Sequence, residues 1–131
     1  MLLNDVLQWI KSLDLKFDNY YIGTLDKKKN KSLGLYNLKR DTGPVIALGG
    51  LENTKYKVKR VSLLIHWNCN SGETEEQAVH LYECLLHSTL PVIPNYDCYF
   101  IGMLNSEPIN VGRDDNGICE YVIELEIYYK K

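Results

Sequence analysis

The sequence predicts an α+β fold, with one mostly antiparallel twisted sheet and two helices packed on one face of it. Two stretches repeat apolar residues at helical spacing, and several others alternate with the two-residue period of a strand. The elements follow in the order helix, strands, helix, strands, which is typical of a sheet with its helices segregated to one side.

The composition indicates one folded domain without a general affinity for nucleic acid or membrane. The 131 residues suffice for one core, so we expect a single domain over residues 1–131. Hydrophobic residues form 45% of the chain, and the net charge of −2 gives no electrostatic signature of DNA binding. No apolar run reaches the ~20 residues of a membrane helix and no signal peptide is evident, so we expect a soluble cytoplasmic protein with reduced cysteines.

Three elements are predicted before residue 40. The first is a helix, whose apolar stripe consists of Leu3, Val6, Leu7, Ile10 and Leu13. Residues 17–25 predict a strand, and residues 26–31 a charged, solvated loop. Residues 33–38 predict a second strand, which faces the core with Leu33, Leu35 and either Tyr36 or Leu38.

A long loop is predicted over residues 40–53, which are rich in glycine and proline. A loop of this length in a small domain is either functional or mobile. Its segment 47–51 is apolar and therefore requires a surface to cover, either the protein's own core or another chain.

A strand, a turn and a helix over residues 56–90 form the unit on which the other elements are expected to pack. The core face of the strand consists of Val61, Leu63, Ile65 and Trp67. Tyr56 and Val58 fall on the other face. Either a bulge near Lys59 and Arg60 realigns the two halves, or the strand is straight and its first half lies beyond the core.

The helix of this unit has one apolar face, which consists of Ala78, Leu81, Tyr82, Leu85, Leu86 and Thr89. Thr74 and Gln77 fit a capping box at its start, and Ser71 is the competing cap. Pro91 ends the helix.

The polar face of the same helix carries three candidate metal ligands, His80, Cys84 and His87. His80 and His87 are two turns apart, ~10 Å along the axis, which is too far for them to share one ion. A pair of Cys84 with either histidine remains, although structural zinc sites usually have four ligands. The alternative is a polar face open to solvent or to a partner subunit.

Three further elements complete the sheet. Residues 96–104 predict a strand that is apolar on both faces and therefore central, and residues 107–111 a short strand. Residues 112–117 predict a turn in which the Asp and Asn side chains bond their own backbone. The last strand faces the core with Cys119, Tyr121, Ile123, Leu125, Ile127 and Tyr129. Its outward acids can pair with Lys55, Lys57 and Lys59 on an adjacent strand.

Four segments taken together carry a family resemblance over residues 20–129. They are Leu33-Gly34-Leu35-Tyr36, Ala47-Leu48-Gly49-Gly50, the strand and helix over 61–86, and Pro108 to Gly117 running into the last strand. In this order they resemble the minor capsid or tail-terminator (head–tail joining) proteins of long-tailed bacteriophages and prophages. The Gly-Arg-Asp-Asp-Asn-Gly turn is the most specific of them.

The resemblance implies a subunit that closes into a ring of its own copies, a hexamer, which caps the tail tube and joins it to the head. It implies contacts with a tail tube protein and a head-completion protein, and transient, sequence-independent contact with DNA in the lumen. Assembly would take place in the cytoplasm of the bacterial host, and the ring would lie at the head–tail junction of the virion. Neither catalysis nor a cofactor is implied. The candidate interface residues are Leu48, Gly49, Gly50, Lys57, Lys59, Arg113, Asp114 and Asp115.

Two other classes of function compete with assembly. One is a small nucleic-acid-binding module that uses residues 55–60, with their lysines, Arg60 and nearby tyrosines. The other is a small hydrolase or metal enzyme built on His80 and Cys84. No Gly-rich phosphate loop and no nucleophile elbow supports an enzyme in this sequence.

Overall fold

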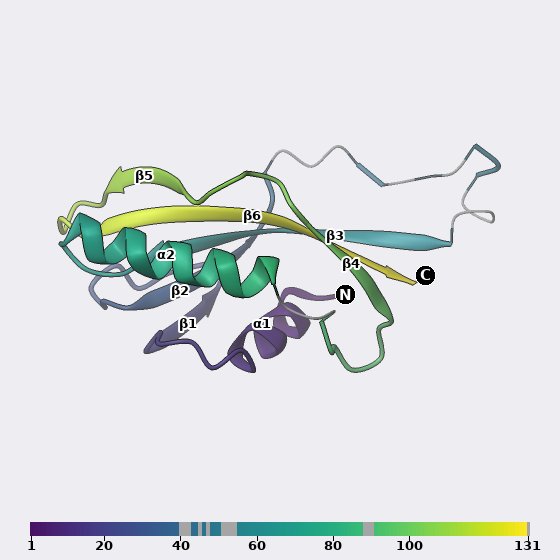
Figure 1. The fold of residues 1–131 in the computed structure, drawn as a ribbon, viewed down its shortest axis with the longest axis horizontal. Helices are drawn as coiled ribbons and strands as arrows, with labels where there is room; N and C mark the ends of the chain where they lie inside the picture. The colour runs from purple at the N-terminus through teal and green to yellow at the C-terminus, as the bar shows by residue number, and fades with distance from the viewer. Residues whose placement is uncertain (40–42, 45, 47, 51–54, 88–90, 131) are drawn as a thin grey trace.

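The computed structural model describes residues 1–39, 43–44, 46, 48–50, 55–87 and 91–130 (Figure 1). Its elements are α1 (Leu3–Lys11), β1 (Asn19–Ile22), β2 (Ser32–Asn37), β3 (Tyr56–His66), α2 (Ser71–Leu86), β4 (Cys98–Met103), β5 (Ile109–Arg113) and β6 (Cys119–Lys130). Two helices and one six-stranded, mostly antiparallel sheet confirm the predicted α+β class.

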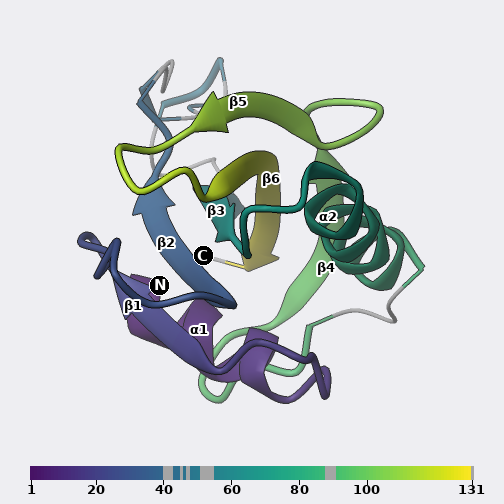
Figure 2. The ribbon, with the colours of Figure 1, turned by 90° about the vertical axis from the view of Figure 1, so that its left-hand side faces the viewer.

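The sheet is organised about the antiparallel pair β3 and β6. Its strand order is β1-β2-β3-β6-β4, and β5 pairs with β6 beside β4, so β4 and β5 share one edge of β6. Only β1 and β2 run parallel among the paired strands. Figure 2 shows the strong twist, with β2 and β4 on opposite sides of the central pair.

The pairing of β3 with β6 shows whether β3 contains the bulge considered near Lys59 and Arg60. The pairing runs without a shift from Tyr56 opposite Lys130 to His66 opposite Glu120. The strand is therefore straight, and the alternative of a bulge near Lys59 and Arg60 is wrong. Side chains alternate along a strand, so the odd-numbered residues of β3 face the helices and the even-numbered ones face away.

Both helices pack on the odd-numbered face of the sheet. α1 lies against β1 and β2, and α2 against β6 and β3. A single core cluster joins the two helices to β2, β3 and β6, and its fully buried side chains include Ile10, Leu35, Leu63, Leu81 and Leu125. This confirms the prediction that two helices cover one face.

Several local predictions require correction. Asn70, and not Thr74 or Ser71, caps α2, because its side chain accepts a hydrogen bond from the Glu73 amide at 3.1 Å. β1 is shorter than the predicted 17–25. The strand predicted to be central, β4, is an edge strand, because it stands last in the strand order and pairs with β6 on one side. Leu86 is exposed at the end of α2, and Thr89 lies outside the described residues.

The acids of β6 also have partners other than those predicted. β3 is the adjacent strand, but Lys57 and Lys59 lie opposite Tyr129 and Ile127 on the helix side. The acids face the open side, where Arg60 Nε lies 3.0 Å from Glu126 Oε2. Because side chains alternate along a strand, the acids of β6 share a face with an arginine and a histidine of β3 and not with its lysines.

The histidine is His66, which lies fully buried at the end of β3 on the face away from the helices. Its Nδ1 lies 3.1 Å from Glu120 Oε2, and its Nε2 lies 3.2 Å from the carbonyl oxygen of Lys27. Both ring nitrogens therefore face oxygens that accept hydrogen bonds. Burial, and then the charge of the neighbouring Glu120 carboxylate, raise the pKa of Tyr36 on the same face.

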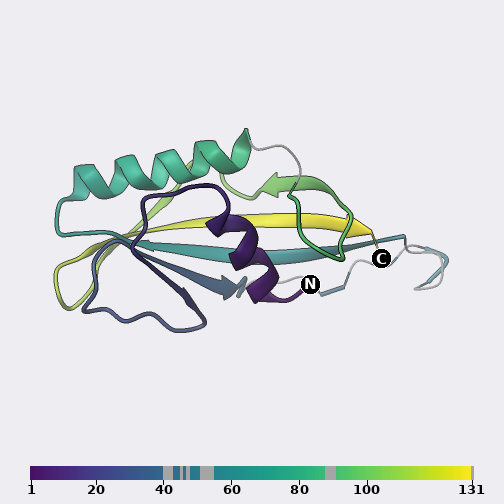
Figure 3. The ribbon, with the colours of Figure 1, turned by 90° about the horizontal axis from the view of Figure 1, so that it is seen from below.

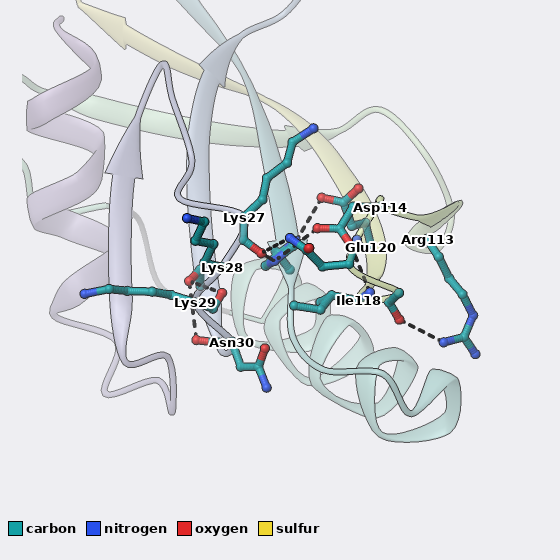
Figure 4. A network of polar contacts seen from close by, with 12 residues as sticks. Lys27, Lys28, Lys29, Asn30, Arg113, Asp114, Ile118 and Glu120 are labelled. Carbon is teal, nitrogen blue, oxygen red and sulfur yellow. Dashed lines mark hydrogen bonds and ion pairs between the residues drawn. The ribbon is translucent and has the colours of Figure 1, made fainter.

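Asp114 completes this network, which Figure 4 shows together with its neighbours. Its side chain is only 1% exposed, and its Oδ2 lies 3.6 Å from Nε2 of His66. The other oxygen, Oδ1, accepts hydrogen bonds from the amides of Asn116 and Ile118, each at 2.9 Å. The network thus joins the loop before β2, the end of β3 and the turn between β5 and β6.

Replacing His66 with Phe is expected to lower the free energy of unfolding by about 3 kcal/mol, because the carboxylates of Asp114 and Glu120 then lose a buried partner. Urea unfolding followed by circular dichroism measures the change. Ser62→Ala, four residues earlier on the same face but only half-buried, is the control and should change it by less than about 0.5 kcal/mol. A loss below about 1 kcal/mol for His66→Phe would contradict a stabilising role of the network.

Candidate assembly surfaces

One end of the sheet is rich in lysine. The start of β3 and the end of β6 extend past both helices (Figures 1 and 3), and Lys55, Lys57, Lys59 and Lys130 lie there. We call these four residues the basic end. The N-terminal ammonium group is close by, with its nitrogen 3.3 Å from the hydroxyl of Tyr129. Burial and then the charge of Lys59 lower the pKa of this group.

The face of the sheet away from the helices is apolar at the same end. Tyr56, Tyr99, Phe100 and Tyr128 form an aromatic cluster there, in which the ring centroids of Phe100 and Tyr128 are 5.3 Å apart. About half of the Tyr99 and Phe100 side chains is exposed. Burial, followed by the charge of Glu126, raises the pKa of Tyr128. Aromatic rings that are half exposed are enriched in subunit contacts.

A groove lies between α2 and the connection from β4 to β5. It has a volume of about 490 Å³ and is lined by Glu75, Val79, Asn105, Ser106, Glu107, Pro108, Ile109, Asn110 and Tyr121. We call it the acidic groove, because its described lining contains two glutamates and no lysine or arginine. The Tyr121 hydroxyl donates a 2.8 Å hydrogen bond to Glu75, and burial and then this bond raise the pKa of Tyr121.

Two hydrogen bonds hold the outer wall of the acidic groove. The Tyr82 hydroxyl of α2 donates to the carbonyl oxygen of Asn105 at 2.7 Å. The side-chain amide of Asn105 donates to Glu124 Oε1 at 3.1 Å. Since these bonds tie the connection to both the helix and the sheet, the groove is a preformed feature of the subunit.

The turn between β5 and β6 contains three of the predicted interface residues. Arg113 does not pair with Asp114, since its Nη1 donates to the carbonyl oxygens of Cys69 at 2.7 Å and Gly117 at 3.0 Å. Asp114 is buried in the His66 network. Arg113 and Asp115 are both exposed, so these two of the three charged residues are open to a partner.

The three interface candidates in the loop, Leu48, Gly49 and Gly50, are all among the described residues. Leu48 is fully exposed, with a relative accessibility of 111%, and Ile46 is half exposed. Gly49 and Gly50 are described as well and both have contacts. The neighbouring apolar residues Ala47 and Leu51 lie outside the described residues. Where the loop is described, its apolar side chains therefore face solvent and not the core.

Of the three candidate metal ligands on α2, His80 and Cys84 are in contact and His87 is paired elsewhere. His80 Nε2 lies 3.7 Å from Cys84 Sγ, whereas His87 Nε2 lies 2.9 Å from Glu83 Oε2. Across the described part of the chain, no three side chains of His, Cys, Asp or Glu are grouped so that they could hold a metal ion.

The basic segment 55–60 is divided between the two faces of β3. Lys57 and Lys59 face the helix side, while Tyr56 lies with the aromatic cluster on the other face. Arg60 is engaged by Glu126 and donates to the carbonyl oxygen of Gly43 at 3.1 Å. The lysines and the tyrosines thus do not form one stacking platform for bases.

Sequence reasoning missed both the acidic groove and the His66 network. The groove brings α2 beside residues 105–110, which are about 30 positions away in the chain. The only signal in the sequence was the placement of Glu75 and Val79 on one helix face.

None of the described helices is long and apolar enough to span a bilayer.

The comparison with protein families places the chain in a known family. A family model described as bacteriophage tail terminator protein matches residues 3–131, nearly the whole chain. No curated protein matches the chain. The match agrees with the resemblance carried by the β2 segment and by the turn before β6. The chain belongs to the bacteriophage tail terminator protein family, whose members are structural components of the virion.

Proposed function

We propose that this protein, as a single domain over residues 1–131, is the subunit of a ring that caps the phage tail tube and joins it to the head. The observation that carries the proposal is the family match over residues 3–131. The ring is expected to be a hexamer that forms in the cytoplasm of the bacterial host and remains at the head–tail junction. DNA would pass through its lumen without sequence-specific contacts.

The proposed mechanism depends on complementary surfaces and involves no catalytic residue. A ring closes when one surface of a subunit contacts a different surface of its neighbour and the rotation per subunit completes a circle. One face of the ring then matches the end of the tail tube and stops its growth, and the other face binds a head-completion protein. No cofactor takes part.

The placement of the candidate residues suits a two-sided role. The start of β3, where the loop with Leu48, Gly49 and Gly50 ends, lies at one end of the long axis (Figure 1). The turn with Arg113 and Asp115 lies at the other end, beside the start of α2. We assign one of the two partners, the tube or the head protein, to the loop with Leu48 and the other to the turn with Asp115.

The proposed function predicts that the protein stops tube growth at amounts far below those of the tube protein. Purified tube protein of the same phage would be polymerised with and without this protein, and tube lengths measured by electron microscopy. Light scattering behind a sizing column should show a discrete species whose mass is a multiple of 15.2 kDa, at least at high concentration. Tubes of unchanged length, with no protein at their ends, would contradict the proposal.

Leu48→Glu is expected to weaken tube capping or head joining about tenfold or more, since burying one leucine side chain in a contact contributes ~1.5–3 kcal/mol. Because Leu48 is fully exposed in the subunit, the free energy of unfolding should change by less than about 0.5 kcal/mol. Val92→Glu, at another exposed aliphatic residue, is the matched control and should leave capping intact. Equal loss in both variants would argue against a specific role of the loop.

A further inference from the structure

Most charged side chains in the described part of the chain have no ion-pair partner there. Across the described residues, the one ion pair that joins a lysine or arginine to an acid is Arg60 with Glu126. Lys57 of the basic end and Glu107 of the acidic groove have no ion-pair partner among these residues. Charges of opposite sign are therefore available at two separate places on one chain.

The strands that carry the basic end project past both helices (Figure 3). Lys57 and Lys130 line a hollow of about 590 Å³ there together with Asp97, and the two lysines outnumber this acid. The acidic groove is a separate hollow of about 490 Å³. The basic end, on its projecting strands, and the acidic groove are therefore complementary in charge.

The lining of the groove suits a lysine side chain in particular. Val79 and Ile109 are each about 40% exposed in it and offer apolar contact to the four methylene groups of a lysine. Glu107 and Glu75 then lie where the ammonium group would end. The Tyr121 hydroxyl fixes the carboxylate of Glu75 at 2.8 Å, so this acceptor is already oriented.

We propose that the basic end of one copy, through Lys57, docks into the acidic groove of the next copy, and that this contact is the seam between neighbouring subunits. The inference rests on the proposed ring and names its contact surfaces. The occupant is a second copy of the chain, because the complementary surface is part of the same chain. Since the two surfaces differ, the contact is heterologous, and repeated contacts of this kind generate a ring or a filament.

The test uses charge reversal at the two centres of the seam. Lys57→Glu and Glu107→Lys, each alone, should weaken self-association about tenfold or more, because each places like charges together. Both sites are exposed, so the fold should be unchanged in each variant. Lys28→Glu and Glu76→Lys, at exposed residues outside both surfaces, are the matched controls and should associate as the unchanged protein does.

Mixing the two single variants gives the decisive result. In an equimolar mixture, each contact between unlike variants pairs opposite charges again, so an alternating ring with an even number of subunits should form. Association is measured by light scattering in solution and by mass measurement of rings released from capped tubes. If the variants associate normally alone, or if the mixture stays as weak as its components, the seam is wrong.

The measurements separate a failure of the seam from a failure of the proposed function. A protein that assembles through this seam but does not shorten tubes would contradict tube capping and leave the seam standing. A protein that caps tubes, and whose capping is unaffected by both reversals, would overturn the seam alone. A chain that remains monomeric both in solution and at tube ends would overturn the seam.

Discussion

The antiparallel pairing of β3 with β6 is the constraint on which the rest of this structure depends. All 11 residues of β3 are paired without a shift, so one alternation applies from the basic end to His66. The alternation turns the buried aliphatic residues of both strands to the helices and turns Glu120, Glu124 and Glu126 to the open side. It also sets Lys57 and Lys59 on the helix side, at a point where no helix covers them. The basic end therefore exists because β3 and β6 are longer than the part of the sheet that the helices cover.

The elements with strong periodicity were predictable from the sequence. β3, β6 and both helices alternate or repeat over enough residues for the pattern to identify them and their core faces. The turn at Asp114 was also predictable, since Asp and Asn bond their own backbone wherever the chain reverses. The start of α2 was not, because Asn70, Ser71 and Thr74 are all good caps, and the choice depends on how the chain leaves β3.

What periodicity cannot show is which surface covers an apolar residue. Tyr99 and Phe100 made β4 look like a central strand, although they belong to an exposed cluster at a sheet edge. An apolar residue that a partner chain covers and one that a helix of the same chain covers produce the same apolar pattern in the sequence. The His66 network was hidden for a related reason: its oxygens come from Lys27, Asp114 and Glu120, which are far apart in sequence and meet only after the sheet has formed.

The polar pairs on the open face also act as a check on strand alignment. A slip of one residue between β3 and β6 would turn every side chain of one strand to the other face. Three glutamates of β6 would then enter the apolar core, while His66 and Arg60 would lose the carboxylates opposite them. Two effects therefore raise the free energy of a misaligned sheet: the burial of the acids, and the loss of the carboxylates that pair with His66 and Arg60. In the proposed ring every copy must present the same surfaces, and this penalty keeps the copies uniform.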